Sequence, residues 1–304
     1  MSLIFPTMPT IHTLDLRFLG ADHAIAAYAI PDDAGVTLVE CGPYSTHEHL
    51  LAALAAAGLN PDRVHTVLLT HIHFDHAGAA WWWAARGARI YVHPRGYKHL
   101  LDPSRLYGSA ARLYGEANMA RLWGKMENIA PEQLTAVEDR ETLQLGGRTW
   151  LAHHTPGHAS HHVAWQLEDV VFTGDVGGVR IGDGPVVPPC PPPDIDVAAW
   201  DNSIERLRSL NAKTFYPTHY GAQPASEAYL DELQQRLHRY ADWMRGQLAT
   251  EGDDAPSLTR SFEEMVVKEF RSAGLNDDVI AAYRAANPPL LSVGGLKRCI
   301  EKFG

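Results

Sequence analysis

The chain has 304 residues, of which 45% are hydrophobic and 20% charged, as is usual for a soluble globular protein. This length allows a substantial core, either in one large domain or in a domain with an extension. The formal net charge is -10, which argues against a long basic groove along a phosphate backbone. Nucleic acid is therefore disfavoured as a partner.

Three cysteines, Cys41, Cys190 and Cys299, are spread over the chain. An odd and scattered set is a poor disulfide framework and suits a reducing compartment. The N-terminal stretch MSLIFPTMPTIHTLDLRFLG has no basic region followed by a continuous apolar run, so no signal peptide is expected. Because the longest apolar runs fall far short of the roughly 20 residues that span a bilayer, we predict a cytoplasmic protein that does not enter a membrane.

Short β-rich runs dominate the first part of the chain. Residues 24–30 and 36–40 flank a turn and predict a hairpin, and residues 45–58 predict a helix that ends at a glycine. Residues 64–69 form an apolar run with little polar interruption, which is typical of a strand buried on both faces. That strand leads directly into the sequence THIHFDH at residues 70–76.

Alternating helices and strands are predicted over the next part of the chain. Three tryptophans at residues 81–83 begin a helix, and since three neighbours cannot share one helical face, we expect one or two of them in the core. Residues 95–140 are predicted to be helical and irregular, rich in aromatic residues, and to serve as a lid over a substrate pocket or as a homodimer interface. The further predictions are strands at 89–92, 149–153, 163–167, 170–173 and 213–217, a proline-rich loop at 184–196 and a helix near 198–210.

The character of the chain changes near residue 223. Leucine, tyrosine and methionine recur at helical spacing over residues 226–249, and a capping box of Ser261 and Glu264 predicts the start of a further helix. We interpret residues 223–304 as a helical extension. The alternation of strands and helices before it predicts an α/β layered fold.

Residues of the kinds that bind metal ions lie at the ends of four predicted strands. Each of these places has a strand, then a turn rich in glycine or proline, then a histidine or aspartate. Side chains two residues apart in extended backbone point the same way, so the first two histidines of HIHFDH can approach one ion. The residues are His71, His73, Asp75 and His76, then His158 in TPGH, Asp175 in TGD and His219 in PTH.

Five imidazoles and two carboxylates suit Zn2+, or another divalent ion such as iron or manganese. Seven ligands are too many for one tetrahedral ion and suit two ions that share a bridge. A hydroxide held between two such ions is available at neutral pH, and the ions polarise a carbonyl or phosphoryl oxygen. A single buried histidine is more often a structural residue, but four motifs in order at strand ends favour a metal site.

These motifs resemble those of the metallo-β-lactamase-fold hydrolase superfamily over about residues 20–222. The resemblance implies a four-layer αββα sandwich with two metal ions at one edge, formed by a catalytic domain at residues 1–222. The ligand sets that it implies are His71, His73 and His158 for one ion and Asp75, His76 and His219 for the other, with Asp175 bridging the two.

Two positions carry further information within that resemblance. His73 stands where the non-hydrolytic flavodiiron branch has Glu, which favours hydrolysis over diiron redox chemistry. The first family motif usually ends its strand with Asp, whereas this chain has Glu40. A carboxylate at this position can orient a metal-bound histidine by a hydrogen bond.

Family members cleave thioesters, lactones, β-lactams, phosphoesters and nucleic acids, and one branch oxidises persulfides with a single iron ion. The fold alone does not choose among these activities. The acidic charge and the lack of a large insertion between His158 and His219 argue against the nuclease branches. The absence of a signal peptide argues against a secreted antibiotic-destroying enzyme.

The leading prediction is the hydrolysis of a small ester, thioester or lactone, as in glyoxalase II-like or lactonase-like members. A bridging hydroxide attacks the acyl carbon, Asp175 holds the bridge, and Asp75 or water protonates the leaving group. The alternatives are a mononuclear iron persulfide dioxygenase and a phosphodiesterase or β-lactamase of the same fold.

Overall fold

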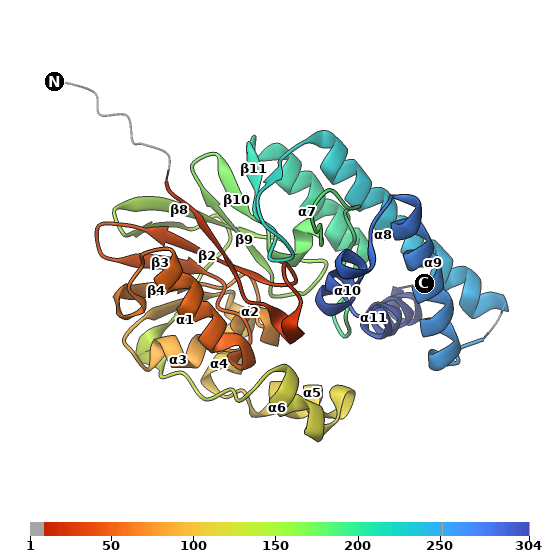
Figure 1. Cartoon of the computed structure of the whole chain (residues 1–304), viewed down its shortest axis with the longest axis horizontal. Helices are drawn as coiled ribbons and strands as arrows, with labels where there is room; N and C mark the ends of the chain where they lie inside the picture. The colour runs from red at the N-terminus through yellow and green to blue at the C-terminus, as the bar shows by residue number, and fades with distance from the viewer. Residues whose placement is uncertain (1–8, 251, 304) are drawn as a thin grey trace.

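Two six-stranded sheets pack face to face, with helices on both outer sides (Figure 1). The structure is a computed structural model that describes residues 9–250 and 252–303. The first eight residues of the stretch used to predict that there is no signal peptide lie outside this range. The arrangement confirms the predicted four-layer αββα sandwich.

The first sheet has the strand order β1-β2-β3-β4-β5-β6. Its first three strands are antiparallel and the remaining ones run parallel to β3. The strands are β1 His12–Asp15, β2 Ala26–Pro31, β3 Val36–Val39, β4 Val64–Leu68, β5 Arg89–Val92 and β6 Leu134–Ala136.

The second sheet has the strand order β12-β11-β10-β9-β8-β7 and is antiparallel except where β10 pairs with β11. The strands are β7 Thr142–Leu145, β8 Arg148–His154, β9 Val163–Leu167, β10 Val170–Phe172, β11 Thr214–Phe215 and β12 Gln223–Pro224.

Alternation along the strands separates the inner core from the two outer ones. In β2, Tyr28 and Ile30 face the second sheet, whereas Ala27 and Ala29 belong to the cluster under the helices. A strand turns successive side chains to opposite faces, so a sheet covered on both sides needs apolar residues at every position. This is why β2 reads as an unbroken apolar run and β4 as an apolar run interrupted only at His65 and Thr66.

Helices cover the outer face of each sheet. Residues of α1 and α3 join the outer cluster of the first sheet, and residues of α7 and α8 join that of the second. The C-terminal helices α9, α10 and α11 extend this second cluster (Figure 1). The helices are α1 His47–Ala56, α2 Phe74–Ala77, α3 Ala80–Ala84, α4 Pro94–Leu101, α5 Ser104–Tyr114, α6 Glu116–Leu122, α7 Val197–Ser209, α8 Glu227–Thr250, α9 Ala255–Ser272, α10 Asp277–Ala286 and α11 Pro289–Phe303.

Some local predictions differ from the structure. Residues 95–140 contain the helices α4 to α6 as expected, but they end in strand β6, which completes the first sheet. The helix assigned to a cap at Ser261 begins earlier, at Ala255, where the side chain of Asp254 accepts a hydrogen bond from the amide of Ser257. Of the three tryptophans, Trp81 and Trp83 are buried, as the helical geometry predicts.

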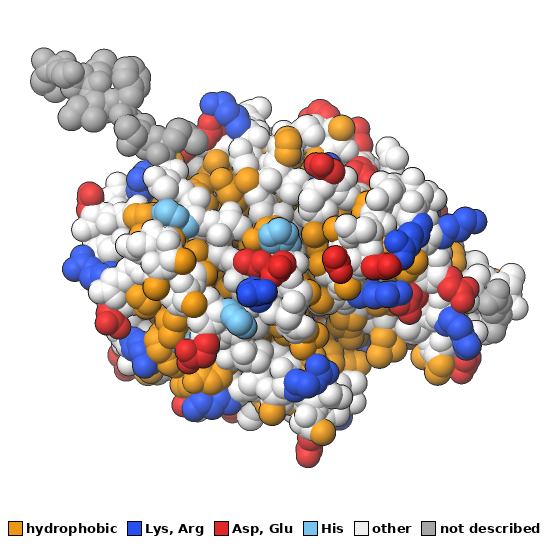
Figure 2. Space-filling model, in the orientation of Figure 1, with side chains coloured by type: hydrophobic (Ala, Val, Ile, Leu, Met, Phe, Trp, Pro, Cys, Tyr) orange, Lys and Arg blue, Asp and Glu red, His pale blue; other side chains and the backbone are white. Residues whose placement is uncertain are grey.

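The surface carries both signs of charge. On the face in Figure 2, Lys and Arg side chains are scattered among acidic ones rather than gathered along one groove. Within the described part of the chain, no helix is both long enough and apolar enough to cross a lipid bilayer.

We expect the inner core to be sensitive to truncation at Trp165. This side chain is fully buried between the sheets, and its indole N–H donates to the carbonyl of Leu69 at 3.0 Å. Trp165→Ala should lower the free energy of unfolding by about 3–5 kcal/mol because it leaves a cavity. Urea unfolding measures this, with Leu113→Ala, at a 45% exposed position, as a control that shifts it by less than about 0.5 kcal/mol. Equal shifts for the two variants would contradict the assignment of Trp165 to the core.

Candidate metal centre

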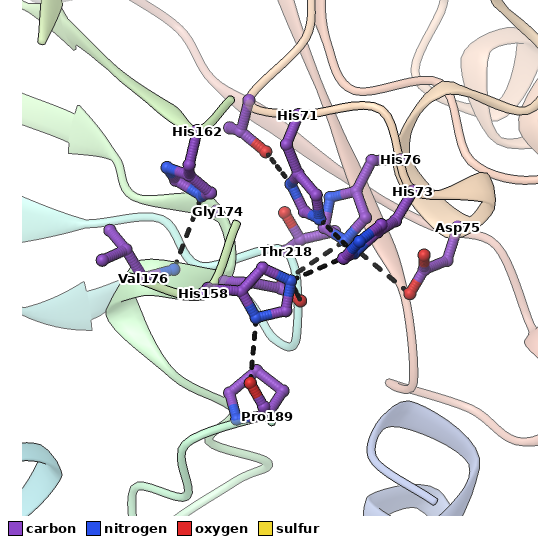
Figure 3. Close-up of polar contacts among 12 residues, drawn as sticks. His71, His73, Asp75, His76, His158, His162, Gly174, Val176, Pro189 and Thr218 are labelled. Carbon is purple, nitrogen blue, oxygen red and sulfur yellow. Dashed lines mark hydrogen bonds and ion pairs between the residues drawn. The ribbon is translucent and has the colours of Figure 1, made fainter. Parts of the chain in front are cut away.

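The sandwich brings the seven predicted ligands together at one edge. His71 and His73 follow β4, and Asp75 and His76 lie in the short helix α2. The other three come from the second sheet: His158 follows β8, Asp175 lies just after β10, and His219 follows β11. Figure 3 shows the side chains from the two halves of the molecule pointing toward one another.

Three histidines form one compact group. The Nδ1 atom of His73 lies 2.9 Å from Nε2 of His71 and 3.1 Å from Nε2 of His158. Zinc–nitrogen bonds of about 2.0–2.1 Å in a tetrahedral site place neighbouring ligand atoms about 3.3 Å apart. The three ring nitrogens therefore have the spacing of ligands around a common ion.

Asp75, His76 and His219 form a second group beside the first. The Oδ2 atom of Asp75 lies 3.7 Å from Nε2 of His76 and 3.5 Å from Nε2 of His219. These atoms also have the spacing of a shared ion site.

Asp175 lies between the two groups. Its Oδ1 atom is 3.3 Å from Nε2 of His76 and 3.4 Å from Nε2 of His219. Its Oδ2 atom is 3.3 Å from Nε2 of His158. One carboxylate thus presents one oxygen to each group, which is the geometry of a bridging ligand.

Unpartnered polar atoms at the centre indicate that these residues fit metal ions. Among the described residues, Nε2 of His76, Nε2 of His219 and Oδ1 of Asp175 are buried without a hydrogen-bonding partner. Buried polar atoms in folded proteins are nearly always paired, and leaving several unpaired at one point is costly. An ion at this point satisfies all three.

Hydrogen bonds on the far side of the rings orient the histidines. The Nδ1 atom of His158 donates to the carbonyl of Pro189 at 2.9 Å, and that of His219 donates to the carbonyl of Ala24 at 2.6 Å. Because a carbonyl only accepts, each Nδ1 carries the proton and each Nε2 has its lone pair free for an ion.

Glu40 is fully buried and makes hydrogen bonds around the predicted ligands His71 and His76, on the side that faces away from the ion sites. Its carboxylate accepts from Nδ1 of His76 at 2.9 Å and from the hydroxyl of Thr218 at 3.2 Å. It also accepts from the hydroxyl of Thr70, which in turn lies 3.0 Å from Nδ1 of His71. The structure thus places Glu40 where it contacts one residue of each histidine group, directly or through Thr70.

The electrostatics differ between the two groups. Burial lowers the pKa of His71 well below its usual value and that of His73 to about 4, and neighbouring imidazoles add to the effect. Burial also opposes the charge on His76, but the carboxylates of Asp175 and Asp75 outweigh it and raise the pKa of His76 well above its usual range. Burial likewise opposes ionisation of Asp75, yet His76 and His219 lower its pKa to about 2.

Several contributors to the site were not predicted. Thr70 immediately precedes the histidine motif, and this position in the sequence could have indicated that its hydroxyl contacts the metal ligands. The carbonyls of Ala24 and Pro189 left no signal in the sequence, because every residue has a carbonyl. Tyr114 at the end of α5 lies near the site, where its burial and the charge of Asp75 raise the pKa of its hydroxyl.

The fold and this arrangement of ligands define a metallo-β-lactamase-like protein. The sequence profile of the metallo-beta-lactamase superfamily matches residues 21–219. The chain belongs to this superfamily, whose fold implies divalent metal ions.

Two curated relatives illustrate the similarity. A metallo-beta-lactamase fold-containing protein of Sulfurisphaera tokodaii is 30% identical over 165 residues, which are 53% of this chain and 62% of that protein. An atrochrysone carboxyl ACP thioesterase of Aspergillus fumigatus is 26% identical over 253 residues, which are 78% of this chain and 64% of that protein. The chain thus spans under two thirds of the length of each.

Solved structures show the same fold. A metallo-beta-lactamase family protein of Thermus thermophilus has a TM-score of 0.68 at 19% identity, and the match covers 97% of this chain and 93% of that one. An archaeal superfamily protein of Sulfolobus tokodaii has a TM-score of 0.60 at 22% identity over 77% of this chain and 87% of that one. At these identities the likeness is one of fold.

Replacing Glu40 tests its place in the site. Glu40→Gln keeps the size of the side chain but removes the charge and puts an amide N–H2 where one oxygen accepts hydrogen bonds. We expect zinc affinity to fall by about 10–100-fold, as for other residues that orient metal ligands. Competition with a chromophoric chelator measures this, with the exposed Glu48→Gln as the control. An unchanged affinity in Glu40→Gln would show that Glu40 is a strand-end acid without a role in binding.

If each group binds an ion, the two groups should release their ions at different pH. His76, with its raised pKa, is protonated at neutral pH in the metal-free protein, so an ion must displace that proton and binds more weakly as the pH falls. His73, with a pKa of about 4, has no proton to displace until far lower pH. On dialysis from about pH 8 to about pH 5, the ion beside His76 should therefore leave before the ion beside His73. Elemental analysis at each pH checks this, and loss of both ions in a single step would contradict it.

Proposed function

We propose that this protein is a metal-dependent hydrolase with two divalent ions, which cleaves a small ester, thioester or lactone. The observation that carries the proposal is the position of Asp175, with one oxygen toward each ligand group. A carboxylate shared in this way is expected for two neighbouring ions. The unpartnered ring nitrogens of His76 and His219 in the second group support a second ion over a mononuclear centre.

The two groups assign ligands to each proposed ion. His71, His73 and His158 hold one ion and Asp75, His76 and His219 hold the other, with zinc favoured by the nitrogen-rich donors and iron or manganese also compatible. When bound, such a pair supplies a water of lowered pKa as nucleophile and a Lewis acid for the carbonyl oxygen.

Asp75 is the residue best placed to move a proton. Its side chain is 19% exposed, against 5% for that of Asp175, so substrate reaches it more readily. Its lowered pKa, about 2, keeps the carboxylate ionised, so that it can accept a hydrogen bond from the attacking water and orient it. The proton lost by the attacking water reaches the leaving group through Asp75 or through a solvent water, which completes hydrolysis. Tyr114, whose hydroxyl pKa responds to the charge of Asp75, is a candidate wall residue of the substrate pocket.

Thioesters are the substrate class that the relatives favour. The thioesterase of Aspergillus fumigatus aligns with 78% of this chain at 26% identity. A thioester also suits the chemistry, because a thiolate leaves readily and needs little help from a strong acid. The whole activity of that longer relative is not assigned to this chain.

The organisation of the chain is part of the proposal. The superfamily profile ends at residue 219 and α8 begins at Glu227, which supports a catalytic domain at residues 1–222 and a helical extension at residues 223–304. The helices between residues 95 and 140 pack beside the metal loop, since Tyr107 and Trp123 contact Phe74 of α2. A lid and a homodimer interface both remain predictions for this segment.

Metal analysis followed by a substrate panel tests the activity. Two zinc ions per chain with turnover of an acyl thioester, an aryl ester or a lactone supports the proposal. One iron ion with oxygen uptake on a persulfide would instead identify a dioxygenase. Turnover of phosphodiesters or β-lactams alone would identify another hydrolase of this fold.

Replacing the bridging carboxylate should abolish the reaction. Asp175→Ala removes an oxygen from each ligand group, so at least one ion should be lost and turnover should fall to background. Elemental analysis and steady-state kinetics measure the two effects, and the exposed Asp183→Ala is the control that should retain both metal ions and turnover. Full activity with two ions bound in Asp175→Ala would refute the proposed centre.

A further inference from the structure

A proline-rich segment lies directly beneath one of the proposed metal ligands. Residues 184–193, here named the proline loop, have six prolines among their last nine residues. Proline has no N–H, so this segment has few donors with which to satisfy its own carbonyls. Its residues 184–190 are nevertheless buried. Its backbone oxygens therefore depend on donors from other parts of the chain.

One carbonyl of the proline loop orients His158. The oxygen of Pro189 accepts the hydrogen bond from Nδ1 of His158 at 2.9 Å, and Figure 3 shows the ring directly beside Pro189. The direction of this carbonyl sets the direction of the imidazole. A shift of the loop at Pro189 thus displaces Nε2, the atom that faces His73 and Asp175.

The C-terminal helices and the turn between them supply hydrogen-bonding partners that hold the loop on both sides of Pro189. The hydroxyl of Tyr283 in α10 donates to the carbonyl of Pro185 at 2.8 Å. Asn287, between α10 and α11, donates to the carbonyl of Pro188 at 3.5 Å. On the other side, the amide of Cys190 donates to the hydroxyl of Ser292 at 3.4 Å, and Ser292 donates to Asn287 at 2.8 Å.

Close packing adds to these hydrogen bonds. A Cβ atom added at Gly295 of α11 would lie 2.0 Å from the carbonyl oxygen of Cys190 and 2.7 Å from the carbonyl carbon of Pro191. Only glycine allows the helix to approach the loop this closely. The adjacent Gly294 is different, because a Cβ there would lie 3.7 Å from the nearest atom, in the ring of Pro192.

We infer that α10 and α11 act as a positioning element for the metal centre, which sets His158 through the proline loop. Asn287, Ser292 and Gly295 are its positioning residues, and none of them is itself a metal ligand. The inference rests on the proposed function, because it assumes that His158 binds an ion. It assigns the C-terminal helices an effect, transmitted through Pro189 and His158, on the ion held by His71, His73 and His158.

A purely structural role for the helices makes a different prediction. Loss of packing between α11 and the loop would lower overall stability and weaken both ion sites together. Positioning through Pro189 instead weakens the three-histidine site selectively. The two possibilities can be separated by measuring each site alone in the full-length protein.

The experiment uses Gly295→Ala and its neighbour Gly294→Ala in two single-site backgrounds. His219→Ala leaves the three-histidine site to be titrated with Zn2+, and His158→Ala leaves the site of Asp75, His76 and His219. In the first background Gly295→Ala should weaken zinc binding by about 10–100-fold, the range for residues that orient metal ligands. In the second background it should have less than about a twofold effect, and Gly294→Ala should have less than that in both.

Ser292→Ala is the second test variant, since it removes a hydrogen-bonding side chain without adding an atom. It should weaken the three-histidine site in the same direction as Gly295→Ala, and it decides the question should Gly295→Ala fail to fold. Equal weakening of both sites, or wild-type affinity at the three-histidine site, would overturn the inference and leave the proposed function intact. Failure of the unsubstituted protein to bind Zn2+, Fe2+ or Mn2+ would overturn the proposed function itself.

Discussion

A single buried carboxylate joins the loops on which the metal centre depends. Glu40 follows β3 with a backbone φ of 64° and is inaccessible to solvent. A buried charge is tolerated only when donors surround it, and here they come from Thr70, His76 and Thr218. These residues belong to the histidine loop of the first sheet and the last ligand loop of the second. The free-energy cost of burying the Glu40 carboxylate is therefore low only when both loops bring their donors to it. Folding of the two sheets and assembly of the metal centre thus depend on each other.

The inner core of the sandwich gives this coupling a rigid frame. Trp150, Trp165 and Phe172 of the second sheet are fully buried against Tyr28 and its neighbours in the first. Ligands follow β4 in one sheet and β8, β10 and β11 in the other, so the spacing of the sheets sets the distance between the ligands. A close-packed core has little freedom to change this distance. Because the loops after these strands are short, the ligands that they carry are held at fixed positions relative to the sheets.

The ligands could be predicted from the sequence because their side chains are chemically distinctive and recur after strands. The same holds for the α/β sandwich, whose buried strands are largely apolar runs. Contacts made through backbone atoms could not be predicted, as the carbonyls of Ala24 and Pro189 show. The start of α9 was misplaced because Asp254 and Ser261 are both suitable capping residues, and only the tertiary structure distinguishes them. The strand β12 was missed because its two residues, Gln223 and Pro224, have no periodicity to detect.

The charges of the ligands bear on which reaction the centre can support. If two divalent ions bind as proposed, the carboxylates of Asp75 and Asp175 neutralise only part of their charge, since the five imidazoles are neutral ligands. Glu40 adds a further negative charge, which its hydrogen bonds to His76, Thr70 and Thr218 partly balance. Each ion would therefore keep part of its positive charge beside the carbonyl of a bound substrate. Such a charge favours the oxyanion that develops when a carbonyl is attacked over the neutral carbonyl itself, and differential stabilisation of this kind is what lowers the barrier to acyl transfer.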